Sequence, residues 1–269
     1  MKAKRHIKEK GPFDIIGDIH GCYEELIQLL TQLGYREAGS VYIHPQGRKI
    51  VSIGDLNDRG PYNLKTICFI MNMVEKGLGL YVYGNHCNKF YRFLLGRKVQ
   101  ISHGLENTVE EYEKLKKEEQ EAFKKKYIKF YEQQSYYWVL DEGKLVVAHA
   151  GIKESLIGRE DVRVEKFCLY GDITGERDEE GHPVRKDWAK EYRGSAVVVY
   201  GHTPVSEPVW INNTIDIDLG CVFGGKLAAL RYPEKEIVAV DSKQPKDEAR
   251  LKRMERKFEE LLEISRMTQ

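Results

Sequence analysis

The chain has 269 residues, 41% of them hydrophobic and 32% charged, so it can bury a substantial core and is not a disordered polymer. Its 43 basic and 42 acidic residues give a formal net charge of +1, which is no strong signal for nucleic acid or for a membrane surface. Its five cysteines form no C-x-x-C pair, and no apolar run approaches the roughly 20 residues of a membrane-spanning helix, so we expect a reduced, cytoplasmic protein.

The N-terminal part alternates predicted strands with predicted helices. The basic residues 1–10 contain no apolar stretch, which favours a solvated leader over a signal peptide. After them, short apolar runs that end in glycine predict strands, and leucines at helical spacing predict helices. The predicted strands are residues 13–16, 50–53 and 78–83, and the predicted helices are residues 22–33 and 64–75.

Residues 105–134 are dense in charge, contain no proline and predict one or two helices. Lysines and glutamates nearly cancel there, so a solvated helical face is the simpler interpretation, and a lid over a substrate is the alternative. We therefore expect a helical insertion at about 105–135.

The C-terminal part returns to strands and closes with a helix. Strands are predicted at residues 145–148 and 196–200, and strand-rich sequence at 209–240 is expected to close one side of the sheet system. Residues 246–267 have apolar side chains at helical spacing, which predicts a helix that packs on its own domain or on a dimer partner. We expect one α/β domain over residues 1–242 and a helical extension over 243–269, and the sequence leaves the oligomeric state open.

Five short segments, each following a predicted strand, place glycine beside Asp, Asn or His. Ligands of open α/β sheets bind at the ends of strands, so these segments are expected to lie on loops that form one site. The candidate donors are carboxylates, an amide and imidazoles, without a thiolate, which suits a divalent ion that binds water and phosphate oxygen. The segments are Gly17-Asp18-Ile19-His20-Gly21, Gly54-Asp55-Leu56-Asn57-Asp58-Arg59-Gly60, Gly84-Asn85-His86, His149-Ala150-Gly151 and Gly201-His202-Thr203.

The spacing of these donors predicts a site for two ions. Asp18 and His20 lie two residues apart on an extended loop, so both side chains point to one side and can hold one ion. Asp55 can give one carboxylate oxygen to each ion. The remaining donors, which complete the second ion's shell, are Asn85, His149 and His202. Two such ions, about 3.5–4 Å apart, hold a hydroxide that attacks phosphorus and clamp the attacking and leaving oxygens.

Three further residues are candidates for the chemistry itself. His86 follows the ligand Asn85 and is better placed as a general acid than as a ligand, because an oxygen that leaves phosphorus needs a proton. Asp58 is expected to orient the His86 imidazole and to raise its pKa. Arg59 offers a planar fork of donors to phosphate oxygens.

The five segments resemble the calcineurin-like metallophosphoesterase superfamily, and Asp58-Arg59-Gly60 is similar to its phosphoprotein phosphatase branch. A closer resemblance, over roughly residues 12–240, is to the bacterial PrpE family. The motifs that carry it are Gly84-Asn85-His86-Cys87-Asn88-Lys89, His103-Gly104-Leu105, Leu169-Tyr170-Gly171-Asp172-Ile173-Thr174-Gly175-Glu176, Tyr200-Gly201-His202-Thr203-Pro204-Val205 and Asp218-Leu219-Gly220-Cys221-Val222-Phe223-Gly224.

This resemblance implies a fold and an activity. The fold would be an α/β calcineurin-like β-sandwich flanked by helices, with a helical insertion and a C-terminal helix. The activity would be asymmetrical bis(5'-nucleosyl)-tetraphosphatase, which converts diadenosine tetraphosphate to ATP and AMP with nickel or manganese. Phosphotyrosine hydrolysis and binding of nucleotides, GTP among them, are also implied.

The resemblance also assigns residues. Asp18, His20, Asp55, Asn85, His149 and His202 match metal ligands, and His86, Asp58 and Arg59 match catalytic positions. Asp218 matches an active-site acid in the phosphatase module of bacterial polynucleotide kinase-phosphatases, and we place it behind the ligands, near the substrate. Lys89 is a candidate clamp for outer phosphates, or else a solvated lysine. Asn57 stands where relatives carry Val or Thr and is interpreted as a tolerated loop change.

The sequence leaves rival functions open. The same metal chemistry would serve a phosphoprotein phosphatase, for phosphotyrosine or for phosphoserine and phosphothreonine, an RNA-end phosphatase or a symmetrical tetraphosphatase. A scaffold that has lost catalysis is disfavoured by the intact His86, Asp58 and Arg59. Residues 220–226 spell G-x-x-x-x-G-K, but Leu227 replaces the Ser or Thr of a phosphate-binding loop, so we reject that motif.

Overall fold

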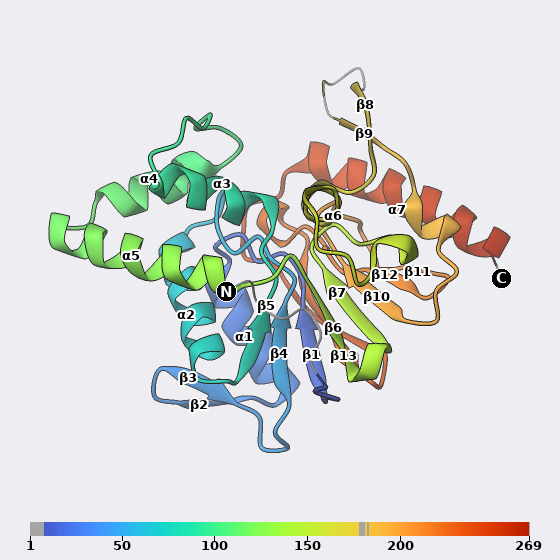
Figure 1. Ribbon diagram of the computed structural model, residues 1–269, viewed down its shortest axis with the longest axis horizontal. Helices are drawn as coiled ribbons and strands as arrows, with labels where there is room; N and C mark the ends of the chain where they lie inside the picture. The colour runs from blue at the N-terminus through green and yellow to red at the C-terminus, as the bar shows by residue number, and fades with distance from the viewer. Residues whose placement is uncertain (1–7, 178–180, 182, 269) are drawn as a thin grey trace.

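The computed structural model describes residues 8–177, 181 and 183–268. Two five-stranded sheets face each other, and helices lie outside them (Figure 1). The first sheet has the order β14-β13-β1-β4-β5, with β1 (Phe13–Ile16), β4 (Lys49–Ser52), β5 (Gly79–Tyr81), β13 (Lys226–Tyr232) and β14 (Glu236–Asp241). The second has the order β11-β12-β10-β7-β6, with β6 (Tyr137–Leu140), β7 (Leu145–Ala148), β10 (Val197–Tyr200), β11 (Trp210–Ile211) and β12 (Thr214–Asp216).

The central strands of each sheet run parallel, and their side chains alternate between two apolar cores. β1 pairs in parallel with β4, and β4 with β5, while β10 pairs in parallel with both β7 and β12. Ile15 and Val51 belong to the core between the sheets, whereas Ile16 and Ile50 belong to the larger core beneath the helices. Strands buried on both faces have mainly apolar sequences, which is why β7 and, apart from Asp14, β1 are evident from sequence.

The helices cover the outer faces of the sandwich. In α1 the buried residues Leu26, Leu29, Leu30 and Leu33 recur at helical spacing, and the helix ends at Gly34, which has a φ of 99°. The helices are α1 (Tyr23–Leu33), α2 (Asn63–Glu75), α3 (Asn85–Leu94), α4 (Leu105–Glu113), α5 (Lys117–Gln133), α6 (Val162–Tyr170) and α7 (Glu248–Thr268). The predicted sandwich with flanking helices, a helical insertion and a C-terminal helix is confirmed.

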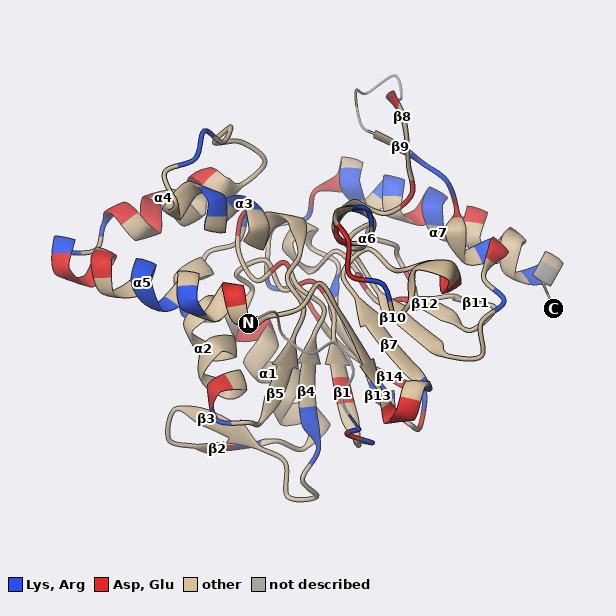
Figure 2. Cartoon of the chain, in the orientation of Figure 1, with Lys and Arg blue, Asp and Glu red and all other residues tan. Residues whose placement is uncertain are grey.

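The helical insertion is packed and is not only a solvated face. Its charged side chains lie along α4 and α5 (Figure 2), but aromatic side chains on α5 are buried against α3. Tyr127 is fully buried, and its hydroxyl donates to the carbonyl of Cys87 at 3.2 Å. On α4, Thr108 is fully buried and contacts Asp58 in the second predicted segment. The insertion therefore holds α3 and one wall of the site.

Helix α7 packs on the same domain, beside the second sheet. Met254 and Leu261 are buried, and the Ser265 hydroxyl donates to the carbonyl of Trp210 on β11 at 2.9 Å. Gly220, on the loop after β12, has a φ of 63°, a conformation that favours glycine, and a Cβ there would lie 2.6 Å from the flexible end of the Met254 side chain. Figure 1 shows α7 on the opposite side of the sandwich from α4 and α5.

The structure differs from the sequence-based expectation in three places. The strand predicted at 78–83 is shorter, and Asn85 and His86 lie in the first turn of α3 and not on a loop. Residues 209–240 do not close one side, because β11 and β12 join the second sheet while β13 and β14 join the first. Two hairpins were not predicted, β2 (Arg36–Ala38) with β3 (Val41–Ile43) and β8 (Ile173–Arg177) with β9 (Pro183–Arg185).

The remaining expectations concern the ends of the chain and its surroundings. Of the predicted leader, residues 1–7 lie outside the described residues. None of the helices in the described ranges is long and apolar enough to cross a membrane. No disulfide joins the five cysteines, all of which the structure describes.

Candidate metal centre and active site

The five predicted segments converge at the carboxyl ends of the parallel strands of both sheets. Asp18 and His20 follow β1, Asp55 follows β4, and Asn85 follows β5 at the start of α3. From the second sheet, the site takes His149 after β7, His202 after β10 and Asp218 after β12. We call Asp18, His20, Asp55, Asn85, His149 and His202 the donor cluster.

Asp55 lies at the centre of the donor cluster. Its Oδ2 is 3.4 Å from His149 Nε2 and 3.7 Å from His20 Nε2, and its Oδ1 accepts the backbone N–H of His86 at 3.0 Å. A Cβ at Gly84 would collide with Oδ1 of Asp55, so only glycine allows this approach. One carboxylate thus faces an imidazole from each sheet, as a bridging ligand must.

The first half of the donor cluster is Asp18 with His20. Nδ1 of His20 donates to the carbonyl of Asn57 at 2.7 Å, which leaves Nε2 as the lone-pair atom that faces Asp55. Asp18 is buried, and its Oδ1 has no hydrogen-bond partner among the described residues. Burial, followed by the charges of Asp218 and Asp55, raises the pKa of Asp18 well above its usual value. A carboxyl group in this condition is stable in the protonated form, or in the ionised form when a positive charge lies nearby.

The second half brings together Asn85, His149 and His202. Nδ1 of His149 donates to the carbonyl of Ile53 at 3.1 Å, so its Nε2 is an acceptor. That atom lies 2.9 Å from Oδ1 of Asn85, which is also an acceptor, and 3.0 Å from Nδ1 of His202. Burial lowers the pKa of His149 to about 3 and that of His202 well below its usual value, so both rings are neutral. Two acceptors in contact need a cation between them, and this donor set fits a divalent metal ion.

His86, Asp58 and Arg59 form a hydrogen-bonded group beside the cluster. Nδ1 of His86 lies 2.6 Å from Oδ2 of Asp58, so the predicted orientation of the ring is present. Arg59 donates to Nε2 of His86 at 2.9 Å and to Nε2 of His20 at 2.7 Å. The expected upward shift of the His86 pKa is wrong. Burial, followed by the charge of Arg59, lowers the pKa of His86 well below its usual value.

Asp58 itself is held by residues whose role was not predicted. Its Oδ1 accepts from the Thr108 hydroxyl at 2.6 Å and from the Asn57 side-chain amide at 2.6 Å. Burial raises the pKa of Asp58 to about 6, against the lowering effect of these two hydrogen bonds. Asn57 is fully buried, so it supports the site and is more than a tolerated loop change. Thr108 was not found because it lies 50 residues from Asp58 in an insertion without a motif.

The backbone is strained at five residues of the site. His20, Asp55, Asp58, Arg59 and His202 all have positive φ, between 39° and 76°. Residues other than glycine rarely adopt this conformation, and it is concentrated where function constrains the chain. The loops therefore hold these side chains in a fixed arrangement.

Asp218 and Lys89 differ in how the structure places them. Asp218 is buried behind Asp18, and its Oδ1 accepts the backbone N–H of Gly220 at 3.0 Å. Burial raises the pKa of Asp218 to about 6. Lys89 lies on α3, and its ammonium donates to the carbonyl of Ser102 at 2.8 Å, so its present contact is with a loop.

Arg185 is a further site residue that sequence analysis missed. It lies on β9, and its guanidinium donates to Nε2 of His202 at 3.0 Å and to the carbonyl of Tyr170 at 2.9 Å. Neither the hairpin nor its register was apparent from the sequence, so no signal pointed to this arginine. It adds a second cation, beside Arg59, at the edge of the donor cluster.

At the site, two of the groups of described residues that can hold an ion share Asp55. One contains His20, Asp55 and His86, and the other contains Asp55, His149 and His202, with ligand atoms within 4.8 Å of one another in each group. His86 is thus close enough to be a ligand, and Arg59 donates to Nε2 of both His20 and His86. The two rings differ at Nδ1, which contacts the Asp58 carboxylate in His86 and the backbone carbonyl of Asn57 in His20. Because a carboxylate at Nδ1 favours the protonated ring, we assign His86 to proton transfer and keep Asp18 and His20 for the first ion.

Comparisons with known proteins identify the family and the fold. A model of the calcineurin-like phosphoesterase family matches residues 11–237, a range that ends before α7. Two proteins named bis(5'-nucleosyl)-tetraphosphatase PrpE (asymmetrical) are close relatives. The one from Geobacillus thermodenitrificans is 57% identical over 232 residues, which cover 86% of this chain and 95% of that protein. The one from Anoxybacillus flavithermus is 54% identical over 233 residues, which cover 87% and 95%. A crystal structure described as a candidate diadenosine tetraphosphatase has a TM-score of 0.62 at 21% identity, covers 90% of this chain and 97% of that one, and shows the same fold.

Proposed function

We propose that this chain, which belongs to the calcineurin-like phosphoesterase family and to its PrpE group, hydrolyses bis(5'-nucleosyl) tetraphosphates asymmetrically, diadenosine tetraphosphate giving ATP and AMP. The observation that carries the proposal is the position of Asp55, whose carboxylate faces His20 from one sheet and His149 from the other. The relatives that are 54% and 57% identical are named for this reaction.

The donor cluster is suited to two divalent ions, which enzymes of this family use. Asp18, His20 and Asp55 would hold one ion, and Asp55, Asn85, His149 and His202 the other. Nickel or manganese is our proposal for their identity, because imidazole and carboxylate donors suit both. When bound, the ions supply a water-derived nucleophile and Lewis-acid polarisation of the phosphoryl group.

Arg59 binds and orients the phosphoryl group in this proposal. Its guanidinium carries five N–H donors in a planar fork, and two of its nitrogens now donate to His20 and His86. Non-bridging phosphate oxygens are stronger acceptors for the same donors, because both partners are then charged. Arg59 thus exchanges imidazole contacts for phosphate contacts when substrate enters.

His86 and Asp58 handle the leaving oxygen. The Asp58 carboxylate fixes Nδ1 of His86, so Nε2 is the atom that faces the site. Once Arg59 has moved from Nε2 to the phosphate, Nε2 can take up a proton from water and pass it to the oxygen expelled from phosphorus, with the Asp58 carboxylate stabilising the charged ring. Thr108 and Asn57 keep the Asp58 carboxylate in place. Asp218 adds negative charge beside Asp18, which favours a bound cation, and Lys89 becomes a phosphate contact if it leaves Ser102.

The asymmetry of the cut depends on how the substrate is held. Attack at an end phosphorus of the tetraphosphate chain releases a nucleoside monophosphate and a triphosphate, whereas attack at a middle phosphorus releases two diphosphates. Both reactions use the same metal chemistry, so the proposed outcome rests on the activity for which the close relatives are named.

A substrate panel tests the proposal. The purified chain, saturated with manganese or nickel, is offered diadenosine tetraphosphate, a phosphotyrosine peptide, a phosphoserine peptide and a 5'-phosphorylated RNA. We expect kcat/KM for the tetraphosphate to exceed that for each other substrate by about tenfold or more, a difference of about 1.4 kcal/mol in transition-state binding. Faster hydrolysis of a phosphopeptide or of the RNA end would replace this function with a phosphatase.

A further inference from the structure

Helix α7 brings an arginine to the edge of the active site. The guanidinium carbon of Arg250 lies 5.4 Å from the ring centroid of Phe223, and the guanidinium carbon of Arg59 lies 5.3 Å from the same centroid. Phe223 follows Asp218 on the loop after β12, in the 3-10 helix η4 (Cys221–Phe223). Arg250 is therefore joined to the phosphate-binding Arg59 through one aromatic ring.

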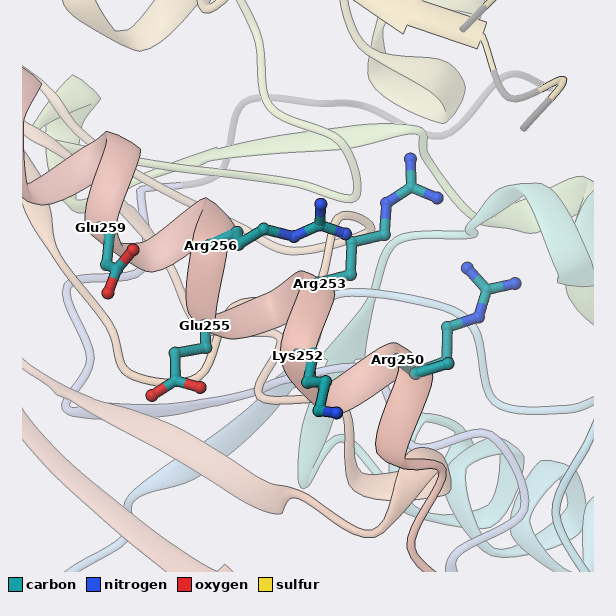
Figure 3. A pocket seen from close by; sticks show the side chains of 7 residues that line it. Arg250, Lys252, Arg253, Glu255, Arg256 and Glu259 are labelled. Carbon is teal, nitrogen blue, oxygen red and sulfur yellow. The ribbon is translucent and has the colours of Figure 1, made fainter. Parts of the chain in front are cut away.

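Arg253 extends this cationic region along the helix. It lies three residues after Arg250, so the two side chains leave α7 on neighbouring positions of one face, about 5–6 Å apart at Cβ. Both residues are half-buried. Figure 3, a close view of a hollow on α7, shows both guanidinium groups reaching to the same side of the helix while Lys252 points away from them.

The two arginines of the site lie against the donor cluster, and the two of α7 lie beside them. Arg59 donates to Nε2 of His20 at 2.7 Å, and Arg185 donates to Nε2 of His202 at 3.0 Å. Four arginines from three separate segments thus gather beside the donor cluster, and like charges gathered in this way are stabilised by a polyanion.

We propose that Arg250 and Arg253 form a second phosphate-binding group, which takes the phosphates of a polyphosphate chain beyond the one that reacts at the donor cluster. Two planar forks of donors at adjacent positions match successive phosphates of such a chain. The inference rests on the proposed function, since only a substrate with a phosphate chain reaches from Arg59 to α7. It assigns α7, which lies beyond the residues matched by the family model, a role in substrate choice.

Binding of inorganic tripolyphosphate and of orthophosphate, measured by calorimetry, tests the proposal. The full-length chain is kept at a saturating, buffered concentration of free manganese, so that the polyphosphate does not strip the site. In the double variant Arg250→Gln with Arg253→Gln, the Kd of tripolyphosphate should rise about tenfold or more, because each lost contact is a hydrogen bond between charged groups. The Kd of orthophosphate, which reaches only Arg59 and the ions, should rise less than about twofold. Equal changes for both anions would overturn the proposal.

Two further variants separate a local effect from net charge and from folding. Lys252→Gln with Arg266→Gln removes the same charge from exposed positions of α7 and should leave both Kd values within about twofold of the parent chain. Arg250→Lys with Arg253→Lys keeps the charge without the fork and should weaken tripolyphosphate less than the glutamine pair. If the glutamine pair does not fold, Arg253→Gln alone, which leaves the Phe223 contact intact, should raise the Kd of tripolyphosphate about threefold. A rise for the Lys252 and Arg266 pair as large as that for the arginines would contradict the assignment.

This inference and the proposed function fail separately. Tripolyphosphate binding that depends on the two arginines, in a chain that does not cut the tetraphosphate, would support the phosphate-binding group and refute the proposed substrate. Tetraphosphate cleavage with a KM that the glutamine pair does not change would support the function and refute the inference.

Discussion

Asp55 and His86 are in contact, yet the structure gives them different tasks. Oδ1 of Asp55 accepts the backbone N–H of His86, and Oδ2 faces the two imidazoles of the donor cluster. The His86 ring lies beside His20, with its Nδ1 at the Asp58 carboxylate and its Nε2 at Arg59. The assignment therefore rests on the partners of each side chain: Asp55 faces an imidazole from each sheet, and His86 has a carboxylate at Nδ1.

Replacing these two residues separates metal binding from proton transfer. His86→Ala should lower kcat by about 10²–10⁴ and leave the metal content near that of the parent chain, because the loss is that of a general acid. Asp55→Ala should lose both activity and metal, because it removes the shared ligand. Elemental analysis of the purified variants distinguishes the two, and a metal-free His86→Ala protein would show that His86 is a ligand.

Thr108 tests whether the insertion contributes to catalysis. Thr108→Val removes the hydroxyl that donates to Asp58 but keeps the shape of the side chain, so kcat should fall about tenfold, as expected for loss of a hydrogen bond to a charged group. Thr31→Val is a matched control, since Thr31 bonds only the carbonyl of Ile27 on the exposed side of α1. Steady-state kinetics on both variants measures the effect, and equal rates for the two would remove Thr108 from the account.

At the scale of elements, the sequence predicts a strand or a site residue only where the residues that determine it are neighbours in the chain. β1 and β7 were evident because short, mainly apolar runs precede a glycine or histidine, and the donors follow directly. Arg185 could not be placed, since its position depends on a hairpin whose register has an irregularity. The start of α3 at Asn85 was missed because Gly84 gives no side-chain cap, so nothing in the sequence marks the helix there.

The insertion helix α5 should stabilise the whole domain through its aromatic face. Phe130 is 3% exposed and stacks on Tyr81 of β5, with ring centroids 5.5 Å apart. Phe130→Ala should lower the free energy of unfolding by about 3–5 kcal/mol, the usual cost of emptying a large buried site. Lys129→Ala, an exposed neighbour on the same helix, should stay within about 0.5 kcal/mol. Urea denaturation measures both, and similar values would mean that α5 is not part of the cooperative unit.

At the scale of the molecule, the two sheets meet at the site through carboxyl groups that repel one another when ionised, unless cations bind between them. Asp18 and Asp55 come from one sheet and Asp218 from the other, and burial raises the pKa of all three carboxyl groups. Positive charge at the donor cluster relieves that cost. Metal binding should therefore stabilise the fold as well as the reaction.

Chelation measures this coupling. Removing the ions should lower Tm by an amount on the order of 10 °C, which corresponds to a few kcal/mol for a domain of this size. Asp18→Asn should change the Tm in two ways. It should raise the Tm of the chelated protein, because one buried charge is gone, and it should reduce the gain on adding manganese. Scanning calorimetry with and without metal decides this, and a Tm independent of metal in the parent chain would contradict the predicted site.

The central claim is the position of the cut in the tetraphosphate chain, and the first products to form test it most directly. Diadenosine tetraphosphate is mixed with the metal-loaded chain, and the reaction is stopped when about a tenth of the substrate has been consumed. The nucleotides are then separated by anion-exchange chromatography. The account predicts ATP and AMP in equal amounts from the earliest time point. Two equivalents of ADP would show attack at a middle phosphorus and contradict it.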